Sequence, residues 1–252
     1  MRSQTCPDCG GRGIVIKEGP TASVCLCTKT VRIKNLVNSS HMTGSLREKS
    51  FTSFSLEYYS RTHKDSYSER THYDTAARAM EACKSFVRDC LDGKKPRGLY
   101  IFGQVGSGKT HLACGIANEL IKGGVKVLFM VVPDYLDEIK HSWDQGSDYN
   151  EKEILDSARE VEVLVMDDLG AHSYSEWTKG KIYTILNYRV NNGLPTVITS
   201  NLEYHETEDY LDYRISSRLI ELCRPILLQV NKSEDIRLQK IIRSSQKHRG
   251  RE

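Results

Sequence analysis

The sequence predicts an α/β fold, in which a parallel sheet of five strands is covered by helices on both faces. Three observations lead to this prediction. Five short apolar runs recur along the chain, and segments with apolar residues at helical spacing lie between them. A glycine-rich loop joins the first run directly to a helix. Strands that alternate with helices form parallel sheets with right-handed crossovers, and their ligands bind beyond the carboxyl ends of the strands.

The chain has 252 residues, enough for one domain of about 200 residues and a small module. Hydrophobic residues make up 38% and charged residues 27%, as in ordinary globular proteins. No apolar run approaches the roughly 18 residues of a membrane span, and the first residues lack the apolar core of a signal peptide. We therefore expect a cytoplasmic protein that does not contact a membrane.

The net charge is only +3, too small to indicate nucleic-acid binding by itself. Basic residues nevertheless crowd the C-terminal end, at Lys240, Arg243, Lys247, Arg249 and Arg251. Two interpretations stay open for this segment: a solvated basic tail, or a contact with nucleic acid or another acidic partner.

Four of the eight cysteines form two close pairs near the N-terminus. Cys6 and Cys9 are a CxxC pair, and Cys25 and Cys27 are a CxC pair after a spacer of fifteen residues. This pattern is typical of a structural Zn²⁺ site, which so short a segment needs because it cannot build a core. The alternative, a redox dithiol, is disfavoured because no βαβ pattern accompanies it.

The same segment supplies the strands of a small hairpin, at Ile14–Ile16 and from Ala22 to Leu26. Turn and linker residues follow at Asn38–Ser45. We place a domain boundary there, which gives a zinc module and linker at 1–45 and a larger domain at 46–252. The remaining cysteines are expected to be buried thiols: Cys83, Cys90, Cys114 and Cys223.

The elements of the larger domain follow in order from their apolar spacing. The strands are expected at Gly98–Phe102, Val125–Val132, Val161–Met166, Thr196–Thr199 and Pro225–Val230. Helices are expected at about Asp74–Leu91, after Lys109, from Pro133, and around Trp177–Val190. The polar stretch Gln145–Glu151 is expected to be a loop.

The first strand runs into Gly103-Gln-Val-Gly-Ser-Gly-Lys-Thr110, which fits the phosphate-loop pattern GxxxxGK[ST]. Its glycines let backbone N–H groups face an anion, and the helix that follows points its positive end at the same place. We expect Lys109 to reach the β- and γ-phosphates of ATP and Thr110 to bind Mg²⁺. The alternative, a glycine turn that binds nothing, is disfavoured by the flanking strand and helix. The expected nucleotide contacts are Gly103, Gln104, Val105, Gly106, Ser107, Gly108, Lys109, Thr110 and His111.

The third strand ends in Asp167-Asp168, where a carboxylate beside a phosphate loop helps to hold Mg²⁺. We assign that role to Asp167, and assign Asp168 as general base or positioner of the attacking water. The fourth strand ends in Thr199-Ser-Asn201, and Asn201 is expected to orient the same water. The alternative for Asp167 and Asp168 is that they only form a turn after the strand. The alternative for Asn201 is likewise a turn residue without a role in catalysis.

The order of these motifs resembles the AAA+ ATPases of the bacterial helicase-loader group, the DnaC and DnaI type, to which the transposition helper IstB is related. The resemblance covers about residues 50–240. It includes Phe51-Thr-Ser-Phe54, Asp167-Asp-Leu-Gly170, Asn187-Tyr-Arg189, Pro195–Leu202 and Arg214-Ile-Ser-Ser-Arg218. One departure is the second acid of the Walker B motif, which is Asp168 where most AAA+ proteins have glutamate.

The resemblance implies a P-loop AAA+ domain. Because the sequence ends soon after Arg237, we expect no full helical lid. The resemblance also implies that Asn201 is sensor 1, that Arg218 is the arginine finger that reaches a neighbouring subunit, and that Arg237 is the sensor 2 arginine. Arg214 is the second candidate for the finger, and surface ion pairs are the alternative role for these arginines.

By this resemblance, the chain is expected to be an ATPase that loads a hexameric DnaB-type helicase onto single-stranded DNA. The zinc module would bind the helicase, and the AAA+ domains would self-associate. Two alternatives stay open: an IstB-like transposition helper that acts on duplex DNA, and a nucleotide-dependent adaptor with little turnover.

Overall fold

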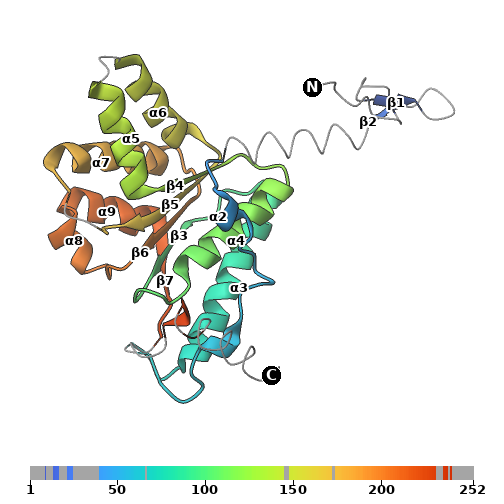
Figure 1. The fold of residues 1–252 in the computed structure, drawn as a ribbon, viewed down its shortest axis with the longest axis vertical. Coiled ribbons are helices and arrows are strands. Elements are labelled where there is room, and N and C mark those ends of the chain that lie inside the picture. Colours follow the sequence, from blue (N-terminus) through green and yellow to red (C-terminus); the bar gives the residue numbers. More distant parts are fainter. Residues whose placement is uncertain are drawn as a thin grey trace, which may run out of the picture.

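The computed structural model describes residues 40–65, 67–144, 148–171 and 174–230, together with Cys9, two short strands before residue 25, and 235–237 and 239. A five-stranded parallel sheet lies at the centre, in the order β4-β5-β6-β3-β7 (Figure 1). These strands are β3 (Gly98–Phe102), β4 (Val127–Val131), β5 (Val163–Leu169), β6 (Thr196–Ser200) and β7 (Cys223–Leu227). The predicted fold class is confirmed.

Two hydrophobic cores lie on opposite faces of the sheet because side chains alternate along each strand. In β3, Leu99 and Ile101 enter one core, and Tyr100 and Phe102 enter the other. The first core contains α3 (His72–Leu91) and α4 (Lys109–Lys122). The second contains α5 (Val132–Asp144), α6 (Asp148–Glu160), α7 (Glu176–Asn191) and α9 (Tyr213–Leu222). The helices therefore cover both faces, as predicted.

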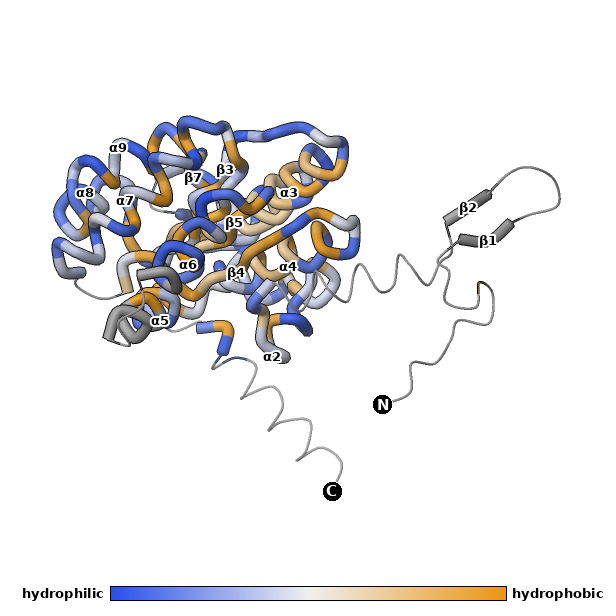
Figure 2. Tube along the Cα trace, turned by 90° about the horizontal axis from the view of Figure 1, so that it is seen from above, coloured by the Kyte–Doolittle hydropathy of each residue, from blue (hydrophilic) through white to orange (hydrophobic). Residues whose placement is uncertain are grey.

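Shorter helices complete the described domain: α2 (Gly44–Arg47), the 3₁₀ helix η1 (Leu56–Tyr58) and α8 (Glu206–Tyr210). Figure 2 shows the central strands mainly in hydrophobic colours and the peripheral α8 in hydrophilic ones. No helix among the described residues is long and apolar enough to cross a membrane.

One predicted loop is wrong. The polar stretch Gln145–Glu151 was expected to be a loop, but α6 begins at Asp148. This helix buries only a narrow apolar stripe, including Leu155 and Ala158, so its sequence carries a weak helical pattern. Its position depends on tertiary contacts, among them hydrogen bonds from Arg189 to the carbonyls of Ala158 and Arg159.

Four of the five strands have bounds that differ from the prediction, and the largest differences are at β7 and β5. The strand expected from Pro225 starts two residues earlier, at Cys223, because β7 is an edge strand, where a proline is tolerated. The third strand was expected to end at Met166 but continues to Leu169, so it contains both aspartates.

The N-terminal hairpin is confirmed as two antiparallel strands, β1 (Ile14–Ile16) and β2 (Ala22–Val24), with Ile14 opposite Val24. Cys9 is buried. The other three predicted zinc ligands, Cys6, Cys25 and Cys27, lie outside the described residues. The same holds for the basic C-terminal residues from Lys240 onward.

Candidate nucleotide site

The phosphate loop lies between the end of β3 and the start of α4. Gly106 and Gly108 have φ angles of 78° and 97°, the left-handed region that glycine adopts without a steric penalty. Gly108 is the N-cap of α4, which begins at Lys109. The N–H groups of the first helical turn, which lack partners within a helix, therefore open toward the loop.

Lys109 is buried beneath this loop. Its Nζ donates hydrogen bonds of 2.7 Å to the carbonyl oxygens of both Gly103 and Gln104. Burial lowers the pKa of Lys109 to about 8. A third N–H of the ammonium group is left for an anion in the loop, and a nearby phosphate would stabilise the charged form that burial disfavours.

Asp167 meets Thr110 at the magnesium position expected from the sequence. Thr110 Oγ1 lies 2.9 Å and 3.1 Å from the two carboxylate oxygens of Asp167. Thr199 Oγ1 donates to Asp167 Oδ1 at 2.6 Å and fixes the carboxylate from the next strand. Burial raises the pKa of Asp167. A hydroxyl and a carboxylate that converge beside a phosphate loop are the donor set for Mg²⁺.

A β-bulge explains how two consecutive aspartates reach the same cavity. The pairing of β5 with β6 shifts between Met166 and Leu169, where Asp167 and Asp168 stand. Asp168 adopts a φ of 63°, and its N–H donates to Thr199 Oγ1 at 2.9 Å. Asn201 Nδ2 lies 3.4 Å from Asp168 Oδ1. The bulge therefore aims Asp168 at Asn201.

These groups surround one cavity of about 560 Å³, within the range of small-ligand sites. Most predicted residues line it: Val105, Gly106, Gly108, Lys109, Thr110, His111, Asp167, Asp168, Asn201 and Arg237. Gly103, Gln104 and Ser107 are not among its lining residues. Their carbonyl groups instead fix the loop, since Gly103 and Gln104 accept from Lys109, and Ser107 accepts from Tyr59.

Arg237 reaches the cavity from a segment that lies directly on the phosphate loop. The neighbouring Ile236 N–H donates to the Gly106 carbonyl at 3.3 Å, and a Cβ at Gly106 would collide with the Asp235 carboxyl group. This contact brings Arg237, distant in sequence, to the edge of the nucleotide cavity.

The segment before α3 packs against the other side of the loop, and sequence reasoning did not assign it this position. The Tyr59 hydroxyl donates to the Ser107 carbonyl at 2.6 Å. The His111 ring lies edge-on to Phe54, 5.4 Å between centroids, and its Nε2 lies 2.9 Å from the Ser50 carbonyl oxygen. Lys49 also lines the cavity. Phe51-Thr-Ser-Phe54 was visible in the sequence, but its spacing alone does not indicate what it contacts.

The two arginines proposed as fingers lie on α9, and neither lines the cavity of its own subunit. Arg218 bonds to Glu221 at 2.6 Å, and its buried Nε has no hydrogen-bond acceptor within the described structure. Arg214 is exposed and bound to Asp212 at 2.9 Å. The structure therefore separates Arg214 and Arg218 from the residues that cluster at the phosphate loop.

The cavity thus combines a buried cation, a magnesium donor pair, a carboxylate–amide pair, and an arginine at its edge. This set fits a nucleoside triphosphate with its magnesium ion. When bound, the triphosphate would supply the phosphoanhydride bond that is broken, and this chain's residues would hold the phosphates and the magnesium ion.

Comparison with known proteins also points to a nucleotide-binding protein. Residues 66–240 match the family of IstB-like ATP binding proteins. The chain is 30% identical over 156 residues to the replicative helicase loader DnaI of Bacillus subtilis, covering 57% of this chain and 49% of DnaI. It is 32% identical over 141 residues to the replicative helicase loader DnaC of Escherichia coli K12, covering 56% of each.

Among solved structures, a crystal structure of DnaI aligns with a TM-score of 0.57 at 33% identity, covering 76% of this chain and 93% of that one. The match spans about half the length of each of the two curated relatives, DnaI and DnaC.

Proposed function

The chain belongs to the family of IstB-like ATP-binding proteins, and from that premise we propose that it is an ATP-dependent loader of a replicative helicase. The observation that carries the proposal is the meeting of Thr110 with Asp167 beside the buried Lys109, in a chain similar to DnaI and DnaC. The hexameric DnaB-type helicase and single-stranded DNA are the partners we propose.

In this proposal, Lys109 binds the β- and γ-phosphates, and Thr110 and Asp167 hold Mg²⁺. Asp168 takes a proton from the attacking water, with Asn201 holding the water in place. Their 3.4 Å separation supports this pairing. Arg237 contacts the phosphates from the edge of the cavity.

We further propose that hydrolysis is completed between subunits. Arg218 lies away from the cavity of its own subunit, and its guanidinium has an unpaired buried Nε among the described residues. A second copy of the chain would place this arginine at a neighbour's phosphates, so self-association would be needed for rapid turnover.

A reconstituted loading reaction tests the proposed function. The purified chain, a DnaB-type helicase and closed circular single-stranded DNA are mixed with Mg²⁺–ATP, and helicase bound to the circles is measured. We expect more loaded helicase with the wild-type chain than without it, and no increase with Lys109→Ala. Equal loading with and without the chain would reject the proposal.

The IstB-like family match favours a second candidate, a transposition helper that acts on duplex DNA. The two candidates differ in the preferred DNA. A loader should prefer single-stranded to duplex oligonucleotides of the same sequence, whereas a helper should show the opposite preference.

We also propose that Cys6, Cys9, Cys25 and Cys27 bind one Zn²⁺ and form the helicase-binding module. The hairpin supports this proposal because Ile14 pairs with Val24. This pairing brings together the two ends of the segment that separates the two cysteine pairs. The thiolates would hold Zn²⁺ tetrahedrally, as a closed structural site.

Elemental analysis of the purified chain is expected to give about one zinc per chain. The Cys6→Ser/Cys9→Ser variant should lose that metal and the fold of its N-terminal module, while its ATP affinity stays unchanged. A Cys83→Ser variant is the matched control, because Cys83 is buried in the first core, and it should keep the zinc. Metal-free wild-type protein with a folded N-terminal module would contradict the assignment.

A further inference from the structure

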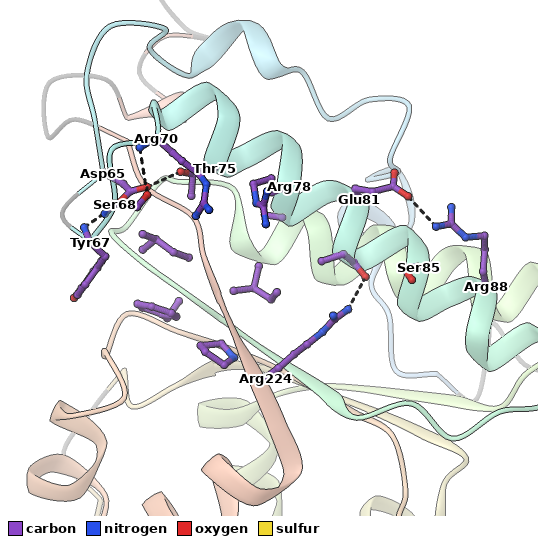
Figure 3. A pocket seen from close by; sticks show the side chains of 16 residues that line it. Asp65, Tyr67, Ser68, Arg70, Thr75, Arg78, Glu81, Ser85, Arg88 and Arg224 are labelled. Atoms are coloured by element: carbon purple, nitrogen blue, oxygen red, sulfur yellow. Dashed lines mark hydrogen bonds and ion pairs between the residues drawn. The ribbon is translucent and has the colours of Figure 1, made fainter.

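A second and larger cavity, of about 820 Å³, lies between α3 and the edge strand β7 (Figure 3). It shares no lining residue with the nucleotide cavity. The loop before α3 borders it, held in place by Asp65, which accepts hydrogen bonds from Ser68 Oγ at 2.6 Å and Thr75 Oγ1 at 2.8 Å. We call this cavity the α3–β7 groove.

Arginines dominate the charge of the α3–β7 groove. Four of them line it: Arg70, Arg78, Arg88 and Arg224. The acids in the lining are Asp65 and Glu81. Glu81 is paired with Arg88 at 2.8 Å, and the loop hydrogen bonds hold the pKa of Asp65 below its usual value despite partial burial. No described residue pairs with the Arg78 guanidinium. The groove therefore presents a net positive surface.

The edge of β7 is poorly suited to receive a peptide strand. The Leu228 N–H donates to the Phe102 carbonyl at 2.8 Å, so alternate residues of this segment face β3. By this alternation, residue 225 faces the open edge, and Pro225 has no N–H to offer an added strand. An occupant must therefore be recognised by side chains rather than by strand pairing.

We propose that the α3–β7 groove binds the phosphate backbone of single-stranded nucleic acid. Guanidinium groups bind phosphates in a bidentate manner. Arg78 on α3 and Arg224 on β7 line the groove from its two walls, so a strand lying between them would reach both guanidinium groups. The chain's own C-terminal segment is rich in lysine and arginine, and its charge makes it an unsuitable occupant.

An exposed aromatic residue favours a single strand over a duplex or an acidic peptide. Tyr67 lines the groove and is 58% exposed. Unpaired bases stack on such rings, whereas the bases of a duplex are already stacked on each other. Arginines beside an exposed aromatic ring are the usual surface for single-stranded nucleic acid.

The groove also adjoins the nucleotide site through the sheet. Phe102 and Leu227 line the groove. Phe102 directly precedes Gly103, the first residue of the phosphate loop, and Leu227 directly precedes Leu228. A Cβ at Gly103 would collide with the Leu228 carbonyl group. A strand bound in the groove would therefore contact the two β-strands that position the phosphate loop.

This inference takes its partner, single-stranded nucleic acid, from the proposed function. The test distinguishes a failure of the groove from a failure of the proposed function. The full chain is titrated against a fluorescent 15-nucleotide oligothymidylate at several salt concentrations. We expect Arg78→Ala/Arg224→Ala to weaken binding at least roughly tenfold and to lower the salt slope by about 1.4, or 0.7 per phosphate contact. Tyr67→Ala should weaken binding roughly tenfold with the salt slope unchanged, and Tyr67→Phe should restore it.

The charge-matched control is Lys84→Ala/Lys126→Ala, since Lys84 lies on the same helix and neither lysine lines the groove. It should bind like wild type, and both double variants should keep wild-type ATP affinity as a check of folding. If both double variants weakened oligothymidylate binding equally, the groove would not be the binding site, although the chain would still bind DNA. Failure of the wild-type chain to bind would overturn both. If the chain bound polyglutamate but not oligothymidylate, and the groove substitutions weakened that binding, the occupant of the groove would be an acidic peptide and the proposal of nucleic acid would be wrong.

Discussion

Replacing Arg189 by methionine is expected to destabilise the protein by at least about 3 kcal/mol. Arg189 is fully buried, and every hydrogen-bond acceptor that the described residues offer it is neutral. Its Nε donates to Thr196 Oγ1, and its two terminal nitrogens donate to the carbonyls of Ala158, Arg159, Val161 and Pro195, at 2.7–3.1 Å. Burial lowers the pKa of Arg189 to about 9, so the guanidinium stays protonated at neutral pH.

These hydrogen bonds join the end of α6 to the starts of β5 and β6. Ala158 and Arg159 lie in the last turn of α6, where carbonyl groups lack helical partners and carry partial negative charge. Methionine has similar length but no donors, so the buried carbonyls would lose their partners. The variant should melt roughly 6–12 °C below wild type, as measured by thermal denaturation followed by circular dichroism.

Arg88→Met is the matched control for this substitution. Arg88 pairs with Glu81, but 61% of its side chain is exposed, so its loss should change stability by less than about 1 kcal/mol. If Arg189→Met melted within 2 °C of wild type, the assignment of Arg189 as the link between α6 and the sheet would be wrong.

The second large effect is expected from Arg218. An arginine supplied by a neighbouring subunit can raise the rate of phosphoryl transfer roughly 10³-fold or more. We expect Arg218→Ala to bind ATP normally but to lose the ATPase activity that rises with protein concentration. Turnover measured at increasing concentrations of wild type and variant, with ATP affinity determined separately, checks this expectation.

Mixing two inactive variants tests whether Arg218 acts between subunits. Arg218→Ala keeps an intact nucleotide site, and Lys109→Ala keeps an intact arginine, so a mixed interface should recover part of the activity. Arg214→Ala is the matched control from the same helix and should retain wild-type turnover. No recovery at any ratio, with both variants folded and associating, would show that Arg218 does not act on a neighbour. If turnover were lost in Arg214→Ala but retained in Arg218→Ala, Arg214 would be the arginine that acts on the neighbouring subunit.

The elements that carry the nucleotide site were predictable because their sequence signals are local. β3 was expected at Gly98–Phe102, and α4 was expected to begin near Lys109, as the structure has them. A buried strand, a glycine loop and an amphipathic helix each leave a pattern within a few residues. The approach of Asp167 to Thr110 followed from the parallel sheet, because strand ends meet at one edge.

Features that depend on tertiary contacts were not predictable. The placement of α6 depends in part on Arg189, which contacts the last turn of this helix from about thirty residues further along the chain. The packing of Tyr59 and Phe54 on the phosphate loop joins residues that no short pattern relates. The α3–β7 groove likewise unites Arg78 with Arg224, whose separate positions in the sequence give no sign of a common surface.

Titration of Mg²⁺–ATP into the wild-type chain and into Lys109→Ala tests the central claim, that the phosphate-loop cavity binds ATP. We expect saturable binding of one ATP per wild-type chain, and affinity weaker by roughly 10- to 150-fold in the variant, because a charge-assisted hydrogen bond is lost. Lys122→Ala, at the exposed end of the same helix, should bind like wild type. Equal affinity of wild type and a folded Lys109→Ala would contradict the account.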